Sequence, residues 1–226
     1  MNPIPDSYSA TTVHILPNTW NWNNGDKVDI WVFANAPQVE LIVNGNSLGK
    51  KPLTRFSHAE WDAVPYAPGS VQAIAYDSNG NMLADTWQNT TGAPVALRAT
   101  IRDNIGTTLY AGCYGDAALV MVDVIDSNGL VVPTANNVIT FTTTGPANFA
   151  GTCNGDPADL TNNKVNYRPA YHGKAMGVIL GPDASAAGST ITVTVSSPGL
   201  TSSQVQIPVV APDSTVGHWC HNGPSL

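Results

Sequence analysis

The chemistry open to this chain depends first on its two glutamates, Glu40 and Glu60. Two carboxylates on either side of a substrate bond can act as general acid and general base. Glu40 lies inside the alternating segment VELIV, which predicts a solvent-facing strand position, and Glu60 precedes Trp61 on another expected strand. Most aspartates fall in turns, where their side chains accept hydrogen bonds from the local backbone: Asp77, Asp103, Asp126 and Asp156. We therefore expect no catalytic carboxylate pair.

Motifs for metal binding and nucleophilic catalysis are also sparse. The sequence contains no Gly-x-Ser-x-Gly, HExxH or phosphate-binding loop. The tail residues His218, Cys220 and His221 are possible zinc ligands, but a tetrahedral site needs a fourth ligand placed by the fold. Side-chain oxygens that could bind Ca²⁺ occur at Asp116, Asn154 and Asp156. Ordering of loops is their favoured role, so we expect no metal and no cofactor, with Ca²⁺ as the alternative.

Aromatic residues set among amides are the best candidate for a binding site. Trp20 and Trp22 precede the first long strand and alternate with Asn21 and Asn23. In an extended segment the two indoles share a face, on which a sugar ring could stack while amides orient its hydroxyls. The alternative is that both indoles pack beneath the first domain. Tyr114, Tyr167 and Tyr171 are secondary candidates on later loops.

Period-two alternation of apolar and polar residues dominates the rest of the chain and predicts an all-β protein with little helix. Asn44-Gly45 supplies a hairpin turn after the second run. In the first half we expect strands at 27–35, 38–44, 59–64, 70–77 and 81–88. In the second half we expect them at 95–103, 116–126, 138–144, 174–180, 189–197 and 203–210.

The domain organisation is predicted from composition and from the position of turn and linker residues. The polar stretch 89–94 divides the 226 residues into two strand-rich parts, so we predict domains at 1–91 and 92–211 and a tail at 212–226. Each domain is expected to be an immunoglobulin-like antiparallel β-sandwich, in tandem. An Asp-Ser-Asn-Gly turn recurs at 77–80 and 126–129, through either shared hairpin chemistry or shared ancestry. With a net charge of −7, the sequence shows neither the basic surface expected of a nucleic-acid-binding protein nor a polybasic segment that would bind a membrane.

Several motifs in order resemble the C-terminal β-sandwich domains of glycoside hydrolase family 2, the β-galactosidase-like enzymes. Residues 20–51, WNWNNGDKVDIWVFANAPQVELIVNGNSLGKK, are similar to the family's "HWNW … VELfvNGkSLG" segment. The resemblance continues through 61–76 (WDAVPYAPGSVQAIAY), 123–137 (DVIDSNGLVVPTANN), 154–157 (NGDP) and 168–175 (RPAYHGKA). It covers about residues 16–210, and the second half also resembles bacterial immunoglobulin-like domains.

The resemblance implies a region outside the catalytic barrel of a parent enzyme. The expected function is non-catalytic binding of carbohydrate, a polysaccharide or galactoside, through Trp20, Trp22, Asn21, Asn23, Tyr114 and Tyr171. The expected partners are carbohydrate and the parent's catalytic domain, in an extracellular or secreted protein. The alternative is a purely structural immunoglobulin-like spacer that braces a catalytic domain, and a glycosidase in its own right is the distant third. The sugar, the parent enzyme, the oligomeric state and the role of Cys220 are left open.

Two departures from the family pattern introduce cysteines at loop tips, Cys113 and Cys153. Strand 116–126 begins just after Cys113, and strand 138–144 runs back towards Cys153. An antiparallel return would bring both cysteines to one end of the sandwich. We therefore predict a Cys113–Cys153 disulfide, with two small buried thiols as the alternative.

Overall fold

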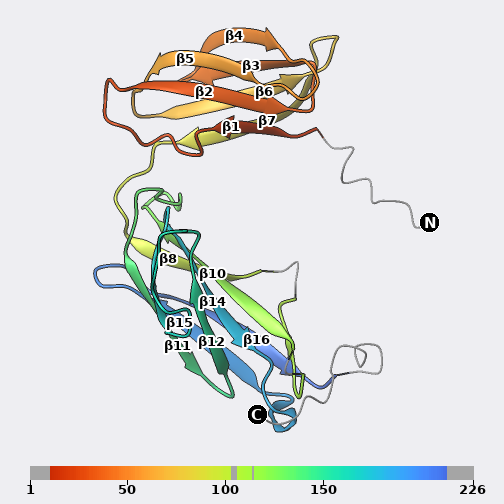
Figure 1. The fold of residues 1–226 in the computed structure, drawn as a ribbon, viewed down its shortest axis with the longest axis vertical. Helices are drawn as coiled ribbons and strands as arrows, with labels where there is room; N and C mark the ends of the chain where they lie inside the picture. The colour runs from red at the N-terminus through yellow and green to blue at the C-terminus, as the bar shows by residue number, and fades with distance from the viewer. Residues whose placement is uncertain (1–10, 103–105, 114, 213–226) are drawn as a thin grey trace, which may run out of the picture. The chain divides into compact units, whose positions relative to one another are not determined.

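The computed structural model describes residues 11–102, 106–113 and 115–212. These residues divide into two compact units, with the boundary between Thr91 and Gly92, where the sequence also places it. Both units are built from β-sheets (Figure 1), which confirms the all-β sandwich prediction. Within the described ranges no α-helix occurs, and the one helical element is the 3-10 turn η3 (Ala184–Ala186).

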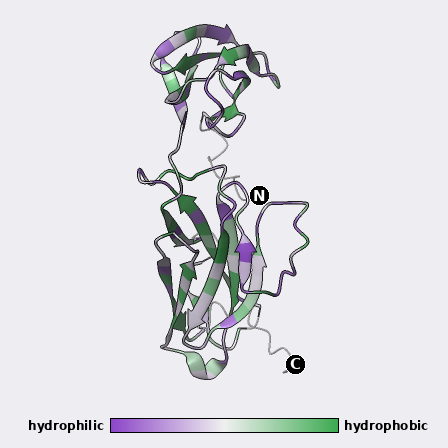
Figure 2. Ribbon diagram, turned by 90° about the vertical axis from the view of Figure 1, so that its left-hand side faces the viewer, coloured by the Kyte–Doolittle hydropathy of each residue, from purple (hydrophilic) through white to green (hydrophobic). Residues whose placement is uncertain are grey.

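The first unit is a sandwich of two antiparallel sheets. One sheet has the order β1-β2-β5, and the other has the order β4-β3-β6-β7. The strands are β1 (Val13–Leu16), β2 (Lys27–Ala34), β3 (Gln38–Val43), β4 (Asn46–Pro52), β5 (Ala59–Pro65), β6 (Ser70–Tyr76) and β7 (Met82–Asn89). Hydrophobic and hydrophilic residues alternate along the strands (Figure 2). Their inner faces form one core: Ile15, Trp20, Val28, Ile30, Val32, Val39, Leu41, Ala59, Trp61, Val64, Tyr66, Val71, Ala73 and Ala75.

The β3–β4 hairpin follows the expected turn chemistry. Asn44 and Gly45 both have positive φ, 49° and 79°, and Val43 pairs with Asn46 across the turn. Positive φ at both central residues is the type I′ turn that Asn-Gly favours because it matches the twist of the strands. Alternate residues of β3 face outward from the core, and Glu40 is one of them.

The second unit has one sheet of order β12-β14-β10-β8 and a second of order β13-β11-β15-β16-β9. The strands are β8 (Ala96–Ile101), β9 (Leu109–Tyr110), β10 (Ala117–Ile125), β11 (Val138–Thr144), β12 (Asn148–Cys153), β13 (Tyr167–Pro169), β14 (Lys174–Leu180), β15 (Thr190–Ser196) and β16 (Ser203–Val210). All pairings are antiparallel among the named strands except β9 with β16. The core includes Val120, Val122, Ile139, Phe141, Ile191 and Val193.

The repeated Asp-Ser-Asn-Gly turns use the same hydrogen bonds in both units. The Oδ1 atom of Asp77 accepts the N–H groups of Asn79 and Asn81, each at 2.8 Å. The Oδ1 atom of Asp126 accepts those of Asn128 and Leu130, each at 2.9 Å. Local turn chemistry is therefore sufficient to explain the repeat.

The structure contradicts the predicted Cys113–Cys153 disulfide. Cys153 carries a free thiol, whereas Cys113 is disulfide-bonded, so the two do not pair with each other. The third cysteine, Cys220, lies outside the described residues.

The physical reason for this error is the unpredicted strand β12. Asn148 at its start lies opposite Leu180, and Cys153 at its end lies opposite Met176. Cys113 stays near the Leu180 end, because its carbonyl accepts the Asp116 N–H and the Asp116 carbonyl accepts the Gly181 N–H. Cys153 pairs with Met176, which lies four residues along β14 from Leu180, and at ~3.4 Å per residue this is a separation of ~14 Å. The distance is far beyond the Cα spacing of a disulfide.

Candidate functional site

The two predicted platform tryptophans have different environments. Trp20 is 1% exposed and belongs to the first core, where its ring lies 5.1 Å from the ring of Tyr66 in an edge-to-face arrangement. A sugar cannot stack on a side chain that is already buried, so the assignment of Trp20 to a binding platform is wrong. The alternative, packing beneath the first domain, holds for Trp20. Trp22 is 41% exposed.

The amides beside these tryptophans bond to their own surroundings. The Asn21 side chain donates to Thr91 Oγ1 at 2.8 Å and accepts the Thr91 N–H at 3.2 Å. The Asn23 side chain donates to the Asp26 carboxylate at 3.2 Å. Asn21 therefore fastens the segment before β2 to the end of the first unit, and Asn23 closes a local turn.

A pocket of about 400 Å³ separates Trp22 from a second half-exposed indole, Trp31. Its lining residues are Leu16, Pro17, Trp22, Lys27, Val28, Asp29 and Trp31. Trp31 is 41% exposed, and its Nε1–H donates to Glu60 Oε1 at 2.7 Å, which fixes the indole. The volume lies within the range of small-molecule pockets. The structure thus pairs Trp22 with Trp31 and not with Trp20.

The alternation of buried and exposed residues along β2 could have identified Trp31 from the sequence, because it occupies the outward position between buried Ile30 and Val32. The same alternation exposes Phe33. The imidazole of His58 lies beside both rings, with centroids 5.2 Å from Trp31 and 5.0 Å from Phe33. An aromatic row therefore runs along the outer face of the β1-β2-β5 sheet.

A second pocket, of about 800 Å³, lies where Phe33 ends this row. It is lined by Thr12, His14, Phe33, Ala34, Asn35, Ala36, Pro37, Leu53, Thr54, Arg55, Phe56 and Ser57. Since Leu16 pairs with Trp31 and His14 pairs with Phe33, β1 flanks the row along one side. The 400 Å³ pocket and this one therefore lie on successive parts of the same strand pair.

The three tyrosines considered as secondary binding residues are Tyr114, Tyr167 and Tyr171, and the structure describes the last two. Tyr171 is exposed and lies beside His172, with ring centroids 4.3 Å apart. It lines a pocket of about 340 Å³ with Cys153 and Asn154. Tyr167 lies on β13 with an exposed side chain. Tyr114 lies outside the described residues.

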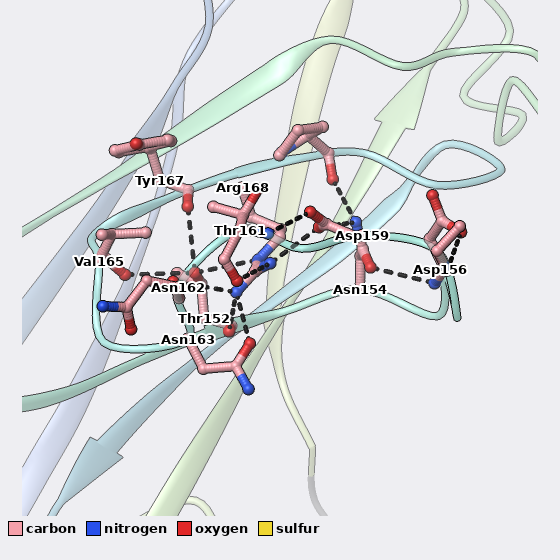
Figure 3. A network of polar contacts seen from close by, with 12 residues as sticks. Thr152, Asn154, Asp156, Asp159, Thr161, Asn162, Asn163, Val165, Tyr167 and Arg168 are labelled. Carbon is pink, nitrogen blue, oxygen red and sulfur yellow. Dashed lines mark hydrogen bonds and ion pairs between the residues drawn. The ribbon is translucent and has the colours of Figure 1, made fainter.

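Buried Arg168 organises the loop that joins β12 to β13, a role the sequence analysis missed (Figure 3). Its side chain is 2% exposed and forms an ion pair with Asp159 at 2.8 Å. It also donates to the carbonyls of Thr152, Thr161 and Asn162 and to side-chain oxygens of Thr152 and Asn163. Hydrogen bonds from Thr161 and Arg168 hold the pKa of Asp159 well below its ordinary value. The network satisfies a buried charge and is structural.

The three oxygen-bearing residues considered for Ca²⁺ serve their own loops. Asp116 accepts the N–H groups of Tyr110 and Ala117. Asn154 donates to Asp159 and to the Pro169 carbonyl, and Asp156 accepts the N–H of Ala158. Asp116 lies near the Leu180 end of β14, whereas Asn154 follows Cys153, which pairs with Met176 at the other end, so the structure does not bring these residues together. Within the described ranges no group of three or more His, Cys, Asp or Glu could hold a metal ion.

The two glutamates project from opposite outer faces of the first sandwich. Glu40 lies on β3 between buried Val39 and Leu41, and Glu60 lies on β5, whose sheet covers the other side of the core. Packed sheets are ~10 Å apart, so residues on their outer faces are farther apart than the ~5 to 9.5 Å of glycosidase carboxylate pairs. These two glutamates therefore cannot flank one glycosidic bond.

Glu40 is instead held by neighbouring hydroxyls. Ser47 and Tyr76 donate hydrogen bonds of 2.6 and 2.7 Å to its carboxylate. These bonds hold the pKa of Glu40 below its ordinary value, and the same contact raises the pKa of Tyr76 to about 12.

No helix in the described part of the chain is long and apolar enough to cross a membrane.

Comparison with known proteins agrees with the sequence motifs. Residues 106–206 match the family described as glycoside hydrolase family 2 C-terminal domain 5, and residues 25–84 match a domain of unknown function, DUF4982. The chain is 36% identical over 170 residues to "Beta-galactosidase BoGH2A" of Bacteroides ovatus, covering 74% of this chain and 19% of that protein. It is 33% identical to a "Putative beta-glucuronidase" of Formosa agariphila, covering 72% and 16%.

A solved β-glycosidase from Bacteroides vulgatus has the same arrangement, with a TM-score of 0.79 and 26% identity over 88% of this chain and 25% of that one. The chain therefore spans about a fifth of the length of the curated relatives it matches.

Proposed function

Because the chain corresponds to the C-terminal β-sandwich region of glycoside hydrolase family 2 enzymes, we propose that it is a non-catalytic accessory region that binds carbohydrate. In this role it holds a parent glycosidase on its polysaccharide or galactoside substrate. The partners are the glycan and the parent's catalytic domain, and the setting is extracellular. Those curated relatives are named for β-galactosidase and β-glucuronidase activities.

The observation that carries the proposal is the pocket between Trp22 and Trp31. Two half-exposed indoles flank a cavity of about 400 Å³ that also contains the charged side chains of Lys27 and Asp29. Sugars are recognised by this combination, because the apolar face of the ring stacks on an indole while polar groups bind its hydroxyls. Trp22 was among the residues expected from the sequence, and Trp31 replaces buried Trp20 as its partner.

Two features support adhesion without turnover. The chain has two glutamates, and they lie on opposite outer faces of one sandwich, too far apart to serve as acid and nucleophile. Several aspartates are engaged in backbone hydrogen bonds, among them Asp77 and Asp126. These two aspartates thus have local structural roles that do not require a substrate.

The alternative function is that of a spacer that braces the catalytic domain. It is favoured by the extent of the exposed aromatic row, since a large apolar patch on one face also suits a protein neighbour. The two functions differ in one measurable property: only the first gives the isolated chain an affinity for glycans.

A glycan-binding screen of the 226-residue chain tests the proposal, with Trp22→Ala as the first variant. If a sugar stacks in the pocket, this change should weaken binding by at least ~1 kcal/mol, or about fivefold, as for loss of an aromatic anchor. Trp20 is unsuitable as a probe because its removal would damage the core. Absence of binding to every polysaccharide in the screen would refute the adhesive function and favour the spacer.

A further inference from the structure

The aromatic row of the first unit extends beyond the Trp22–Trp31 pocket. The outward positions of β2 are Lys27, Asp29, Trp31 and Phe33, and all four are exposed. At ~3.4 Å per residue the row from Lys27 to Phe33 is ~20 Å long, several times the width of one sugar ring. We infer that the outer face of the β1-β2-β5 sheet binds an internal segment of a linear, uncharged polysaccharide that runs along β2. This inference rests on the proposed function and specifies its ligand class.

The aromatic spacing supports an extended ligand. Trp31 and Phe33 are two residues apart on one face of the strand, and the His58 ring contacts both, at centroid distances of 5.2 and 5.0 Å. Each ring offers an apolar surface to a separate sugar unit. The row continues into a pocket at both ends, about 400 Å³ at Trp22 and about 800 Å³ beyond Phe33. A site for one terminal sugar would instead enclose most of that sugar in one cavity.

The polar groups along the row are fixed acceptors. Glu60 Oε1 accepts the Trp31 indole N–H at 2.7 Å, and Asp29 Oδ1 accepts the Ala63 N–H at 2.7 Å. Each carboxylate is therefore oriented by one oxygen, while the structure gives its other oxygen no partner among the described residues. Ionised carboxylates form strong, short hydrogen bonds with hydroxyl donors. Sugar hydroxyls are such donors, so the row pairs stacking surfaces with preset acceptors.

The charges along the row favour an uncharged glycan. Two carboxylates, Asp29 and Glu60, flank Trp31 at the middle of the row, whereas the cations lie at its ends, Lys27 at one end and Arg55 in the pocket beyond Phe33. A uronate or sulfated chain along β2 would bring its own negative charges against both carboxylates. Contacts between like charges are unfavourable, so they discriminate against an anionic glycan.

Trp87 provides a matched control on the other sheet. It lies on β7, is 53% exposed, and its Nε1–H donates to Asp85 at 2.8 Å. It therefore has the same exposure class and the same kind of carboxylate partner as Trp31. Replacing Trp87 removes a surface indole without altering the proposed row.

The test is calorimetric titration of the 226-residue chain with linear β-1,4-linked gluco- and galacto-oligosaccharides of increasing length, with oligogalacturonate as the charged probe. Affinity should increase by about tenfold or more from a disaccharide until the row is filled. Trp31→Ala and Phe33→Ala should each weaken binding of the long neutral ligand about tenfold. Trp31→Phe should retain most of the affinity, Trp87→Ala all of it, and oligogalacturonate should bind more weakly. Thermal melting of each variant confirms that it is folded.

The outcomes separate this inference from the proposed function. Equal affinity for monosaccharides and long chains, preference for the charged probe, or loss of binding in Trp87→Ala and not in Trp31→Ala overturns the inference and leaves sugar binding intact. Failure of every neutral and charged glycan to bind the folded chain overturns both.

Discussion

Replacement of Arg168 by alanine should destabilise the second unit by about 3–5 kcal/mol. The Arg168 side chain is 2% exposed and donates six hydrogen bonds to the loop between β12 and β13, including the ion pair with Asp159. Removing it leaves the Asp159 carboxylate without its cation and several buried oxygens without donors. An unsatisfied buried polar group alone costs ~1–3 kcal/mol.

Arg98→Ala is the matched control. Arg98 forms an ion pair with Asp123 at 2.7 Å, nearly the same distance as Arg168–Asp159, but the Arg98 side chain is 44% exposed. Exposed pairs contribute ~1 kcal/mol or less because water screens them and side-chain entropy opposes them. Lys174 also contacts Asp123 and partly compensates for the loss. The comparison therefore separates a buried arginine with six hydrogen bonds from an exposed one with two.

Urea unfolding followed by far-UV circular dichroism measures both variants. Tryptophan fluorescence serves as an internal control when both variants are made in a Trp219→Phe background, because the other five tryptophans belong to the first unit: Trp20, Trp22, Trp31, Trp61 and Trp87. The Arg168→Ala variant should lose the second unit's transition first while the fluorescence transition stays in place. A loss below ~1 kcal/mol, or an equal loss in Arg98→Ala, would refute the reasoning that this network supports the unit.

Three further changes have defined outcomes. Trp20→Ala should destabilise the first unit by ~3–5 kcal/mol in fluorescence-detected urea unfolding because it empties a core site, whereas Trp22→Ala should cost less than ~1 kcal/mol; equal losses would contradict the different burial of the two indoles. Since the pKa of Glu40 is lowered on folding, its contribution to the stability of the first unit is present above the ordinary glutamate pKa of ~4.3 and is lost as pH falls through the folded-state pKa; Glu40→Gln should therefore reduce the fall of the urea midpoint below about pH 5, and an unchanged fall in that acid range would contradict this. Iodoacetamide should label Cys153 without prior reduction, and a Cys113–Cys153 crosslinked peptide in the mass spectrum would contradict the free thiol.

The long strands could be predicted because each has a clear period of two and buries one face. Strand β2 shows this pattern over its whole length, Lys27–Ala34, and β10 shows it over Ala117–Ile125. The Asn44-Gly45 turn was equally readable, because few residues tolerate two consecutive positive φ angles.

The strands that the sequence analysis missed lack that signal. Strand β4, NSLGKKP, is mostly exposed, and three others are short: β1 has four residues, β9 has two and β13 has three. Strand β12 contains Gly151 and a register shift between Phe149 and Gly151, which interrupts the alternation. Missing β12 reversed the expected direction of the chain before Cys153 and produced the wrong disulfide.

The candidate site was half predictable. The isolated pair Trp20 and Trp22 suggested one exposed surface, but the segment is anchored by Asn21 to Thr91 and turns Trp20 into the core. Trp31 could be assigned to an outward face from the alternation along β2 alone, whereas its pocket with Trp22 depends on how the loop before β2 folds back. That return is set by tertiary contacts and has no local sequence pattern.

The most direct test of the central proposal is to measure adhesion and hydrolysis in one incubation. The purified 226-residue chain is mixed with insoluble neutral polysaccharide, and both the bound protein and the release of new reducing ends are determined. The proposal predicts that protein is retained on the polysaccharide and that no reducing ends accumulate. Reducing ends that persist after repurification, or no retention of the folded chain, would contradict it.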